Sequence, residues 1–364
     1  MENRTVLRIF AAIAPLFTWL LSLLIPRRNA DVAKTECENK CEIMTLVQGF
    51  DSYIDPEGRK PLGPILERCY AMGHFPALWA VEGVGKDLAE QRLAKGGEIH
   101  GILSEAVLGP EWDKSQLMMH AGIGIGFAKY YIERMGNSPS QGEIEAAVER
   151  IVKLCRDNSR PGYYGAAIES LGLASRFMRG PEFCKQAHRA LEAKAPDSID
   201  YFWRGAGRCL YFHPSNFMPG FSRPCRAIDM SKVEAPSPEV RTGMLAGTAW
   251  ALTVVNMRTP QVMEWALAHY DDYDGGNPGF VNGVISSVVM RYDTTPDDPG
   301  IQAFRNHKPA DPNVRAVWER TIRDSVDFAV GAAHPVLKKH ARLDEVFRYQ
   351  DLRALVAELE RNGA

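Results

Sequence analysis

A glycine-rich apolar segment returns about every forty residues along this chain of 364 residues. Its fullest copy, residues 118–135, reads MMHAGIGIGFAKYYIERM. Taking one glycine per copy gives Gly85, Gly124, Gly165, Gly205, Gly243 and Gly283, so the successive separations are 39, 41, 40, 38 and 40 residues. A fixed period of this size is typical of stacked helical hairpins, in which each unit is completed by its neighbours. The period predicts an all-α fold, an α-solenoid-like array of helical hairpins.

The helical pattern begins near residue 64 and continues to the end of the chain. Amphipathic stretches lie between the glycine-rich segments, and residues 143–155 give the clearest one, with Ile144, Val148 and Ile151 on one face. A long proline-containing stretch, residues 214–238, interrupts the pattern. A final helix over residues 343–362 is charged on one side, which suits the capping of an array. We expect a single helical repeat domain over residues 64–364.

The first 28 residues form a separate hydrophobic segment. Residues 9–25 carry no charge over 17 positions, and Arg27 and Arg28 follow directly. A membrane-spanning helix needs roughly 20 apolar residues and accepts about 17, while Pro15 would kink it. A single span, an interfacial helix, a signal peptide and a core helix remain as alternatives. We expect a membrane-anchor or interfacial helix at 1–28, with a cytoplasmic body on the side of the arginine pair, and a polar linker or lead-in at 29–63.

Composition excludes several classes of protein. Lys and Arg total 43 against 45 for Asp and Glu, a net charge of −2, which gives no electrostatic basis for binding nucleic acid. The hydrophobic share of 45% is that of a globular protein and excludes a polytopic membrane protein. Seven cysteines leave at least one unpaired, so we expect a reducing compartment and no disulfide framework.

Cofactor and metal motifs do not reach their required spacing. The glycines at 122, 124 and 126 depart from the dinucleotide fingerprint and lie in a helical context, so we interpret them as residues that let helices approach closely. Cys37 and Cys41 have no second Cys/His pair at zinc-site spacing. The acidic loops at 271–274 and 293–298 lack the order of a calcium loop, and no nucleophile elbow or Walker loop is present. We predict no cofactor and no metal.

Charged side chains on an apolar background mark a candidate polar site. Glu82 lies in the apolar segment 77–85, and a carboxylate buried there needs a partner. Arg204 and Arg208, one helical turn apart, are suited to bidentate pairing. The candidate ligand-binding or buried polar site comprises Glu82, His120, Arg204, Arg208 and Tyr211, with Tyr164 and Tyr201 as further walls. The alternative is a set of structural ion pairs between stacked repeats.

Several of these segments resemble one bacterial family. The segments ALWAVEGVG (77–85), LGP (108–110), MHAGIGIGFA (119–128), GAGRCLYF (205–212) and GMLAGTA (243–249) are similar to the uncharacterised family known as enediyne biosynthesis protein, which is encoded beside enediyne polyketide synthases. The resemblance runs from about residue 49 to about residue 289 and carries no settled reaction. It implies that Glu82, Gly83, His120, Gly122, Gly207 and Arg208 occupy recurrent positions. The hydrophobic start and the stretch 214–238 depart from the family's pattern.

Two functional hypotheses follow, and the sequence does not decide whether the protein is an enzyme. The first is a membrane-associated accessory or scaffold protein that binds a protein partner or a hydrophobic intermediate in polyketide-type secondary metabolism. The second is an enzyme acting on a hydrophobic polyene-like substrate, with Glu82 and His120 as acid/base groups and Arg208 orienting a carboxylate. The second hypothesis requires those three side chains to meet in one pocket. A weaker third hypothesis is a cofactor-free subunit of a membrane electron-transfer assembly.

Overall fold

A computed structural model describes residues 30–53, 62–96, 99–103, 112–216, 226–269 and 277–362. Every regular element in these ranges is helical, which confirms the all-α fold class. The α-helices are α2 (Ala30–Tyr53), α3 (Leu62–Ala71), α4 (His74–Lys95), α6 (Trp112–Arg134), α7 (Gln141–Asn158), α8 (Tyr164–Arg179), α9 (Pro181–Lys194), α10 (Ile199–Phe212), α11 (Arg226–Glu234), α12 (Pro238–Asn256), α13 (Pro260–His269), α14 (Pro278–Thr294), α15 (Pro299–Asn306), α16 (Pro312–Trp318), α17 (Asp324–Phe328), α18 (His334–Lys339) and α19 (Leu352–Asn362). Short 3-10 helices lie at η2 (Pro196–Ser198), η3 (Pro214–Asn216) and η6 (Leu343–Phe347), and π-helical turns at η4 (Glu319–Arg323) and η5 (Ala329–Ala333).

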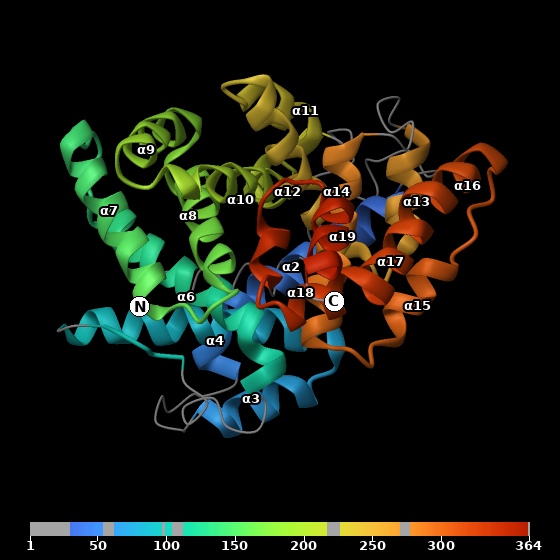
Figure 1. Ribbon diagram of the computed structural model, residues 1–364, viewed down its shortest axis with the longest axis horizontal. Coiled ribbons are helices and arrows are strands. Elements are labelled where there is room, and N and C mark those ends of the chain that lie inside the picture. Colours follow the sequence, from blue (N-terminus) through green and yellow to red (C-terminus); the bar gives the residue numbers. More distant parts are fainter. Residues whose placement is uncertain are drawn as a thin grey trace.

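Alternate helices of the chain form the interior. Helices α4, α6, α8, α10, α12 and α14 pack against one another in that order. Most of their residues are buried on every side: α10 buries all residues from Tyr201 to Phe212, and α6 buries those from Ser115 to Ala128. A helix that is hydrophobic all round belongs in a protein interior. Helices α7 and α9 bury only one face, and Figure 1 shows them at the rim of the molecule.

Glycines stand where the interior helices cross. A Cβ atom on Gly124, Gly172, Gly205 or Gly247 would lie 1.9, 1.8, 1.9 or 1.9 Å from a backbone carbonyl oxygen of the neighbouring helix. Only a hydrogen atom fits at such a distance, so the backbones of successive helices are in contact. The sequence interpretation of the glycines as close-approach residues is confirmed at these positions. Two glycines of the forty-residue series differ. A Cβ on Gly243 would meet only a side-chain atom at 3.9 Å, and one on Gly165 would meet the Tyr201 ring and the Asp344 carbonyl oxygen, so Gly247 and Gly172 are the crossing residues of those segments.

Interior helices also meet partners that are far away in the sequence. Helix α14 contacts α6, and Trp79 of α4 packs edge-on against Trp250 of α12 with their ring centroids 6.5 Å apart. In an open solenoid each unit contacts only its neighbours. The solenoid-like form of the predicted array is therefore not confirmed, since helices separated by several units share one interior.

The predicted linker at 29–63 is wrong for most of its length. Helix α2 occupies it and packs against α4, α12 and α13. Its buried stripe includes Cys37, Ile43 and Val47, and also the charged pair Glu36 and Lys40, which are 0% and 1% exposed. Because two paired charges lie inside the stripe, the stretch is polar in composition although it is packed. The proline-containing stretch 214–238 likewise includes helix α11.

The predicted hydrophobic helix at 1–28 lies outside the described residues. Among the helices that the structure does describe, none combines the length and the apolar character that crossing a bilayer requires.

Candidate functional site

A network of four charged side chains lies where α4, α8 and α10 meet. Arg208 donates to Glu82 Oε1 at 2.5 Å and to Glu169 Oε2 at 3.1 Å. Arg204, one turn earlier on α10, donates to Glu169 Oε1 at 2.9 Å and to the Ser286 hydroxyl of α14 at 2.9 Å. Glu169 therefore bridges both arginines, and the network ties four interior helices together.

The network is closed to solvent. Glu169 and Arg204 are 0% exposed, and Glu82 and Arg208 are 2% exposed. Its two carboxylates and two guanidinium groups balance, which is the condition for keeping charges inside a protein. Both guanidinium groups also lie over the Trp250 ring, with their central carbons 5.6 and 4.6 Å from its centroid.

Burial and pairing act in opposite directions on the pKa values of this network. Burial raises the pKa of Glu82, and Arg208 opposes the rise. Burial lowers the pKa of Arg204 to about 10, with Glu169 opposing. For Arg208, burial also acts downward, but the carboxylates of Glu82 and Glu169 leave its pKa above the ordinary value. A carboxyl group with a raised pKa is suited to acid/base chemistry. The Glu82 carboxyl group is buried, however, so a substrate could not reach it.

His120 makes its hydrogen bonds elsewhere than to Glu82 or Arg208, so the condition that the enzyme hypothesis sets for these three side chains is not met by their hydrogen bonds. Its Nδ1–H lies 2.7 Å from the Gln116 carbonyl oxygen one turn back on α6, and its Nε2 accepts the Arg160 backbone N–H at 3.1 Å. Both ring nitrogens are thus used, which fixes a neutral tautomer. Burial lowers the pKa of this imidazole to about 4. The ring stacks on Tyr163 with 5.0 Å between centroids.

Tyr211 belongs to a second buried group, which attaches α2 to the body. Its hydroxyl donates to Glu36 Oε1 at 2.6 Å and accepts from Asn256 Nδ2 at 2.7 Å. Lys40 pairs with Glu36 at 3.0 Å, and its ammonium group lies 3.8 Å from the centre of the Tyr211 ring. The ammonium also donates to the Asn216 carbonyl oxygen at 2.8 Å. Tyr211 thus links helices structurally and does not line the network of Glu82, Glu169, Arg204 and Arg208.

The other two predicted walls form a pair of their own. Tyr164 and Tyr201 meet edge-on with their centroids 6.3 Å apart, and Tyr164 shares a hydrogen bond of 2.7 Å with Ser198. Of the five predicted site residues, the structure therefore brings together Glu82, Arg204 and Arg208.

Sequence reasoning missed Glu169 and Ser286. A signal for Glu169 was present, because it lies in the small-residue segment 165–174 on the same apolar background that singled out Glu82. Charge balance was a second signal, since two buried arginines against one carboxylate require another anion. Ser286 gave no such signal, because a serine in an apolar helix commonly bonds to its own backbone, as this one also does with the Asn282 carbonyl oxygen.

The six cysteines among the described residues are free thiols. Cys37 and Cys41 lie one turn apart on α2, and the hydrogen bond between their side chains raises the pKa of Cys37 and lowers that of Cys41. Within the described ranges, no group of three or more His, Cys, Asp or Glu side chains is arranged to hold a metal ion.

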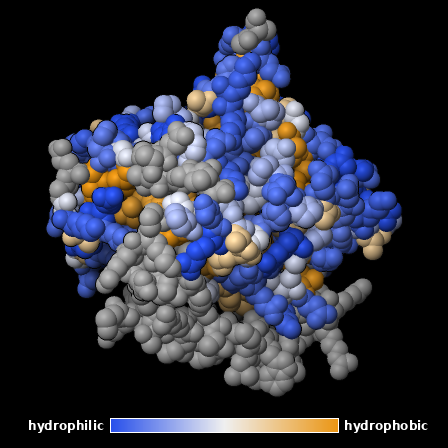
Figure 2. Space-filling model, turned by 90° about the horizontal axis from the view of Figure 1, so that it is seen from below, coloured by the Kyte–Doolittle hydropathy of each residue, from blue (hydrophilic) through white to orange (hydrophobic). Residues whose placement is uncertain are grey.

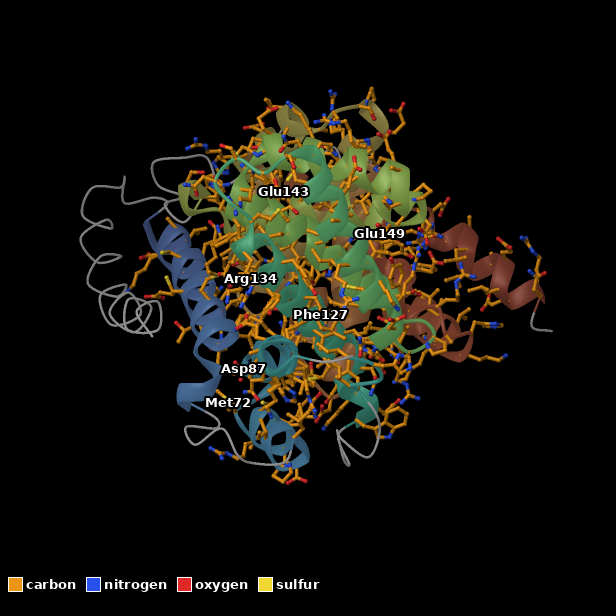
Figure 3. The ribbon with its side chains drawn as sticks, turned by 90° about the vertical axis from the view of Figure 1, so that its left-hand side faces the viewer. Met72, Asp87, Phe127, Arg134, Glu143 and Glu149 are labelled. Atoms are coloured by element: carbon orange, nitrogen blue, oxygen red, sulfur yellow. The ribbon has the colours of Figure 1, made fainter. Side chains whose placement is uncertain are left out.

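A shallow hollow of about 290 Å³ lies on the surface between α4 and α6. Figure 3 looks onto this face, with Asp87 and Arg134 labelled on the two helices. Lys129 crosses the hollow to Glu90 at 3.0 Å, and the Arg134 guanidinium lies 3.4 Å from the centre of the Tyr130 ring. The hollow therefore offers charges of both signs and one aromatic ring.

Comparisons of the chain with protein-family models, with curated proteins and with solved structures found no match. The resemblance to the enediyne biosynthesis family accordingly stays a prediction from sequence segments.

Proposed function

We propose that this protein is an accessory scaffold: a helical body that is held at a membrane by its first residues and binds a protein partner through its surface. The observation that carries the proposal is the sealing of the Glu82–Glu169–Arg204–Arg208 network. Its carboxylates bond to its guanidinium groups across α4, α8 and α10, and Arg204 also bonds to Ser286 of α14, so these charges hold the body together. The alternative of an enzyme built on Glu82, His120 and Arg208 is less well supported, because His120 bonds to the backbone of Gln116 and Arg160 while Glu82 is buried in its ion pair with Arg208.

The surface favours a protein partner over a hydrophobic intermediate. Figure 2 shows a face that is mostly hydrophilic, with hydrophobic residues gathered mainly in one area at the left, next to the grey atoms, and in small spots elsewhere. The hollow between α4 and α6 is lined by charged side chains and Tyr130. Arg and Tyr are enriched at protein interfaces, where they combine apolar area with hydrogen bonding. We assign this hollow as the docking position.

Photocrosslinking in intact producing cells tests the docking position. The photoreactive residue p-benzoylphenylalanine replaces Tyr130 in one variant and Glu149, exposed on α7 (Figure 3), in a matched control. We expect one discrete adduct from position 130 and none from position 149. Adding Arg134→Glu should abolish the adduct. The same adducts from both positions, or none from position 130, contradict the proposal.

The membrane part of the proposal rests on residues 1–28 and is tested separately. We expect the full chain to float with vesicles of zwitterionic and anionic phospholipid, and a chain without residues 1–28 to stay in the soluble fraction. Apolar transfer and arginine contacts with headgroups supply the binding energy. Flotation that is unchanged by the deletion would place the membrane contact elsewhere.

The pathway follows from the sequence resemblance alone. We place the scaffold in polyketide-type secondary metabolism, where it would hold a partner enzyme near the membrane. Deleting its gene should then change the polyketide-type metabolites of the producing cell, and complementation should restore them. A profile that the deletion leaves unchanged removes the pathway and leaves the scaffold proposal standing.

A further inference from the structure

A second polar cluster lies at the junction of α6, α14 and α18. Asp293, in the last turn of α14, accepts two hydrogen bonds on Oδ1: from His334 Nε2 at 2.9 Å and from the Lys338 ammonium at 3.0 Å. Lys338 also donates to Asp113 Oδ2 at 3.0 Å. The side chains of Lys338 and Asp113 are 31% and 63% exposed, so the cluster opens to solvent on that side.

Asp293 is unusually placed for a carboxylate with a purely structural role. Its side chain is fully buried, and Oδ2 has no hydrogen-bond partner. It also lies at the C-terminus of a helix, where the backbone dipole disfavours negative charge. A buried acceptor without a partner costs free energy. Oδ2 is thus an acceptor that no hydrogen bond of the described residues satisfies, and the exposed side of the cluster is formed by His334 and Lys338.

His334 is held as a proton acceptor. Because its Nε2–H donates to Asp293, the neutral ring carries its lone pair on Nδ1. The side chain is 14% exposed, and none of the described residues bonds to Nδ1. Asp293 therefore orients the ring and leaves Nδ1 as the nitrogen that can take a proton, as a carboxylate does behind a catalytic histidine.

A π-helical turn places His334. The turn η5 ends where the His334 N–H bonds to the Ala329 carbonyl oxygen, five residues back. Pro335 follows, and a proline inside an α-helix has no N–H and clashes with the carbonyl oxygen four residues earlier. The wider turn relieves that clash and rotates the helix, and such turns are frequent at functional sites. The sequence Ala-His334-Pro335 thus sets where the imidazole points.

Aromatic rings and further charges lie around the Asp293–His334–Lys338 cluster. Tyr292 packs edge-on against His334 with 5.0 Å between centroids, and Tyr163 stacks on His120 at the same separation. The Tyr163 hydroxyl lies in the field of the cluster: burial, with a smaller contribution from Asp293, raises its pKa to about 12, and Lys338 opposes the rise. Arg160, whose guanidinium lies over the Trp112 ring at 4.3 Å, adds a second nearby cation.

A similar pair elsewhere in the chain serves as a contrast. His307 Nε2 lies 2.6 Å from Glu264 Oε2, and the two histidines, His307 and His334, are similarly exposed, at 16% and 14%. There the second carboxylate oxygen, Oε1, accepts the Ala310 backbone N–H at 3.2 Å. Every carboxylate oxygen of that pair is used, so it fastens a loop to α13. The Asp293 pair has the same bond but keeps one acceptor vacant.

We propose that Asp293, His334 and Lys338 form a binding site for a flat aromatic molecule with an acidic hydroxyl group, a phenol or an enol. The hydroxyl proton moves to His334 Nδ1, and Lys338 stabilises the resulting oxyanion, so one O–H bond breaks and one N–H bond forms. Tyr163 and Tyr292 supply aromatic surface for the ring of the ligand. The site lies on a different part of the body from the hollow at Tyr130, and its success or failure is independent of the docking proposal.

The probe is 4-nitrophenol, whose visible absorbance reports its ionisation. The full-length protein is titrated into the probe at a pH about equal to the probe's own pKa, where about half of the probe is protonated and an ordinary imidazole is mostly neutral. We expect saturable growth of the phenolate band, with a Kd on the order of 1 mM or tighter. The probe 4-nitroanisole, which has the same ring and no hydroxyl, should bind at least about tenfold more weakly, because its proton transfer is absent.

Variants separate the site from the rest of the surface. His334→Gln and Lys338→Met should each reduce phenolate formation by about tenfold or more, whereas His307→Gln should leave it unchanged. Asp293→Asn keeps the shape of the side chain but removes the charge behind His334, so the probe should bind without ionising. Far-UV circular dichroism confirms that each variant is folded, and Lys338→Met, at a partly exposed position, stands in if a histidine variant is not.

Two results would overturn the proposal. One is the absence of a phenolate band with the unaltered protein. The other is an equal loss of phenolate formation in His334→Gln and His307→Gln. That result would show that the signal does not come specifically from the His334 site.

Discussion

Glu169 is the residue on which the buried network depends. It is fully buried and accepts from both Arg204 and Arg208, whereas Glu82 accepts from Arg208 alone. Removing one partner of a buried ion pair costs more than the pair itself contributes, because the remaining charge stays buried without compensation. The two carboxylates should therefore differ in what their loss costs.

We predict that Glu169→Gln lowers the free energy of unfolding by about 4 kcal/mol, and that Glu82→Gln lowers it by about half as much. After the Glu82 change, Arg208 still has Glu169. After the Glu169 change, Arg204 keeps only a serine hydroxyl. Urea unfolding of both variants shows which one loses more unfolding free energy. Equal losses of unfolding free energy would contradict the bridging role of Glu169.

His120 makes stability depend on pH. Burial lowers the pKa of its folded form to about 4, against 6.5 in the unfolded chain. Between these values the unfolded state binds a proton that the folded state does not, so stability falls as the pH decreases from 6.5 and stops falling below about 4. The full loss is about 3 kcal/mol.

His120→Gln keeps an acceptor for the Arg160 N–H but cannot titrate. We expect the difference in unfolding free energy between pH about 7 and about 4.5 to be smaller in this variant than in the unaltered protein by about 2 kcal/mol or more. Urea unfolding at both pH values gives the comparison. An identical pH dependence in the two proteins would mean that His120 is protonated in the fold.

At the scale of the helix, the crossings decide how α6, α8, α10 and α12 pack. A backbone carbonyl cannot move away from a new methyl group as the end of a flexible side chain can, so the glycine positions tolerate no larger residue. These positions were predictable, because the glycine pattern and its physical cause are both local. Helix α2 was not predictable from the sequence, because the buried Glu36–Lys40 pair gives a packed helix the polar composition of a linker.

We predict that Gly124→Ala destabilises the protein by about 3 kcal/mol, since its Cβ would lie 1.9 Å from the Ala167 carbonyl oxygen. The matched control is Gly142→Ala on α7, where no atom lies within 4 Å. Alanine is the better helix former, so the control should gain about 0.5 kcal/mol. Midpoints of urea unfolding measure both, and a neutral Gly124→Ala would refute close backbone contact at this crossing.

At the scale of the whole molecule, contacts across the interior replace the nearest-neighbour order of an open array. The bonds Glu82–Arg208, Arg204–Ser286 and Asn39–Asn256 join residues 126, 82 and 217 positions apart. The sequence period predicted the repeated helical units but not these long-range contacts. A period indicates how units repeat along the chain, and it does not indicate which distant units pack together. The same holds for Asp293 and His334, which are 41 positions apart and are joined only by the fold.

We predict that the described body unfolds as one unit. Nearest-neighbour arrays can lose their ends first, but here removing one end would expose buried charges near the middle. Tryptophan fluorescence, to which Trp79 and Trp250 contribute from the core, and far-UV circular dichroism should give the same urea midpoint. Two separated transitions would indicate repeat-by-repeat unfolding.

The free thiols have a practical consequence for labelling. Burial raises the pKa of Cys69 and Cys209 to about 12, so these groups stay protonated and unreactive toward alkylating reagents while the body is closed. Cys41, partly exposed on α2 and with a lowered pKa, is the described thiol best able to react in the folded protein. A maleimide dye should therefore label Cys41 before it labels the interior thiols. The rate of the later labelling would then measure how often the helical body opens.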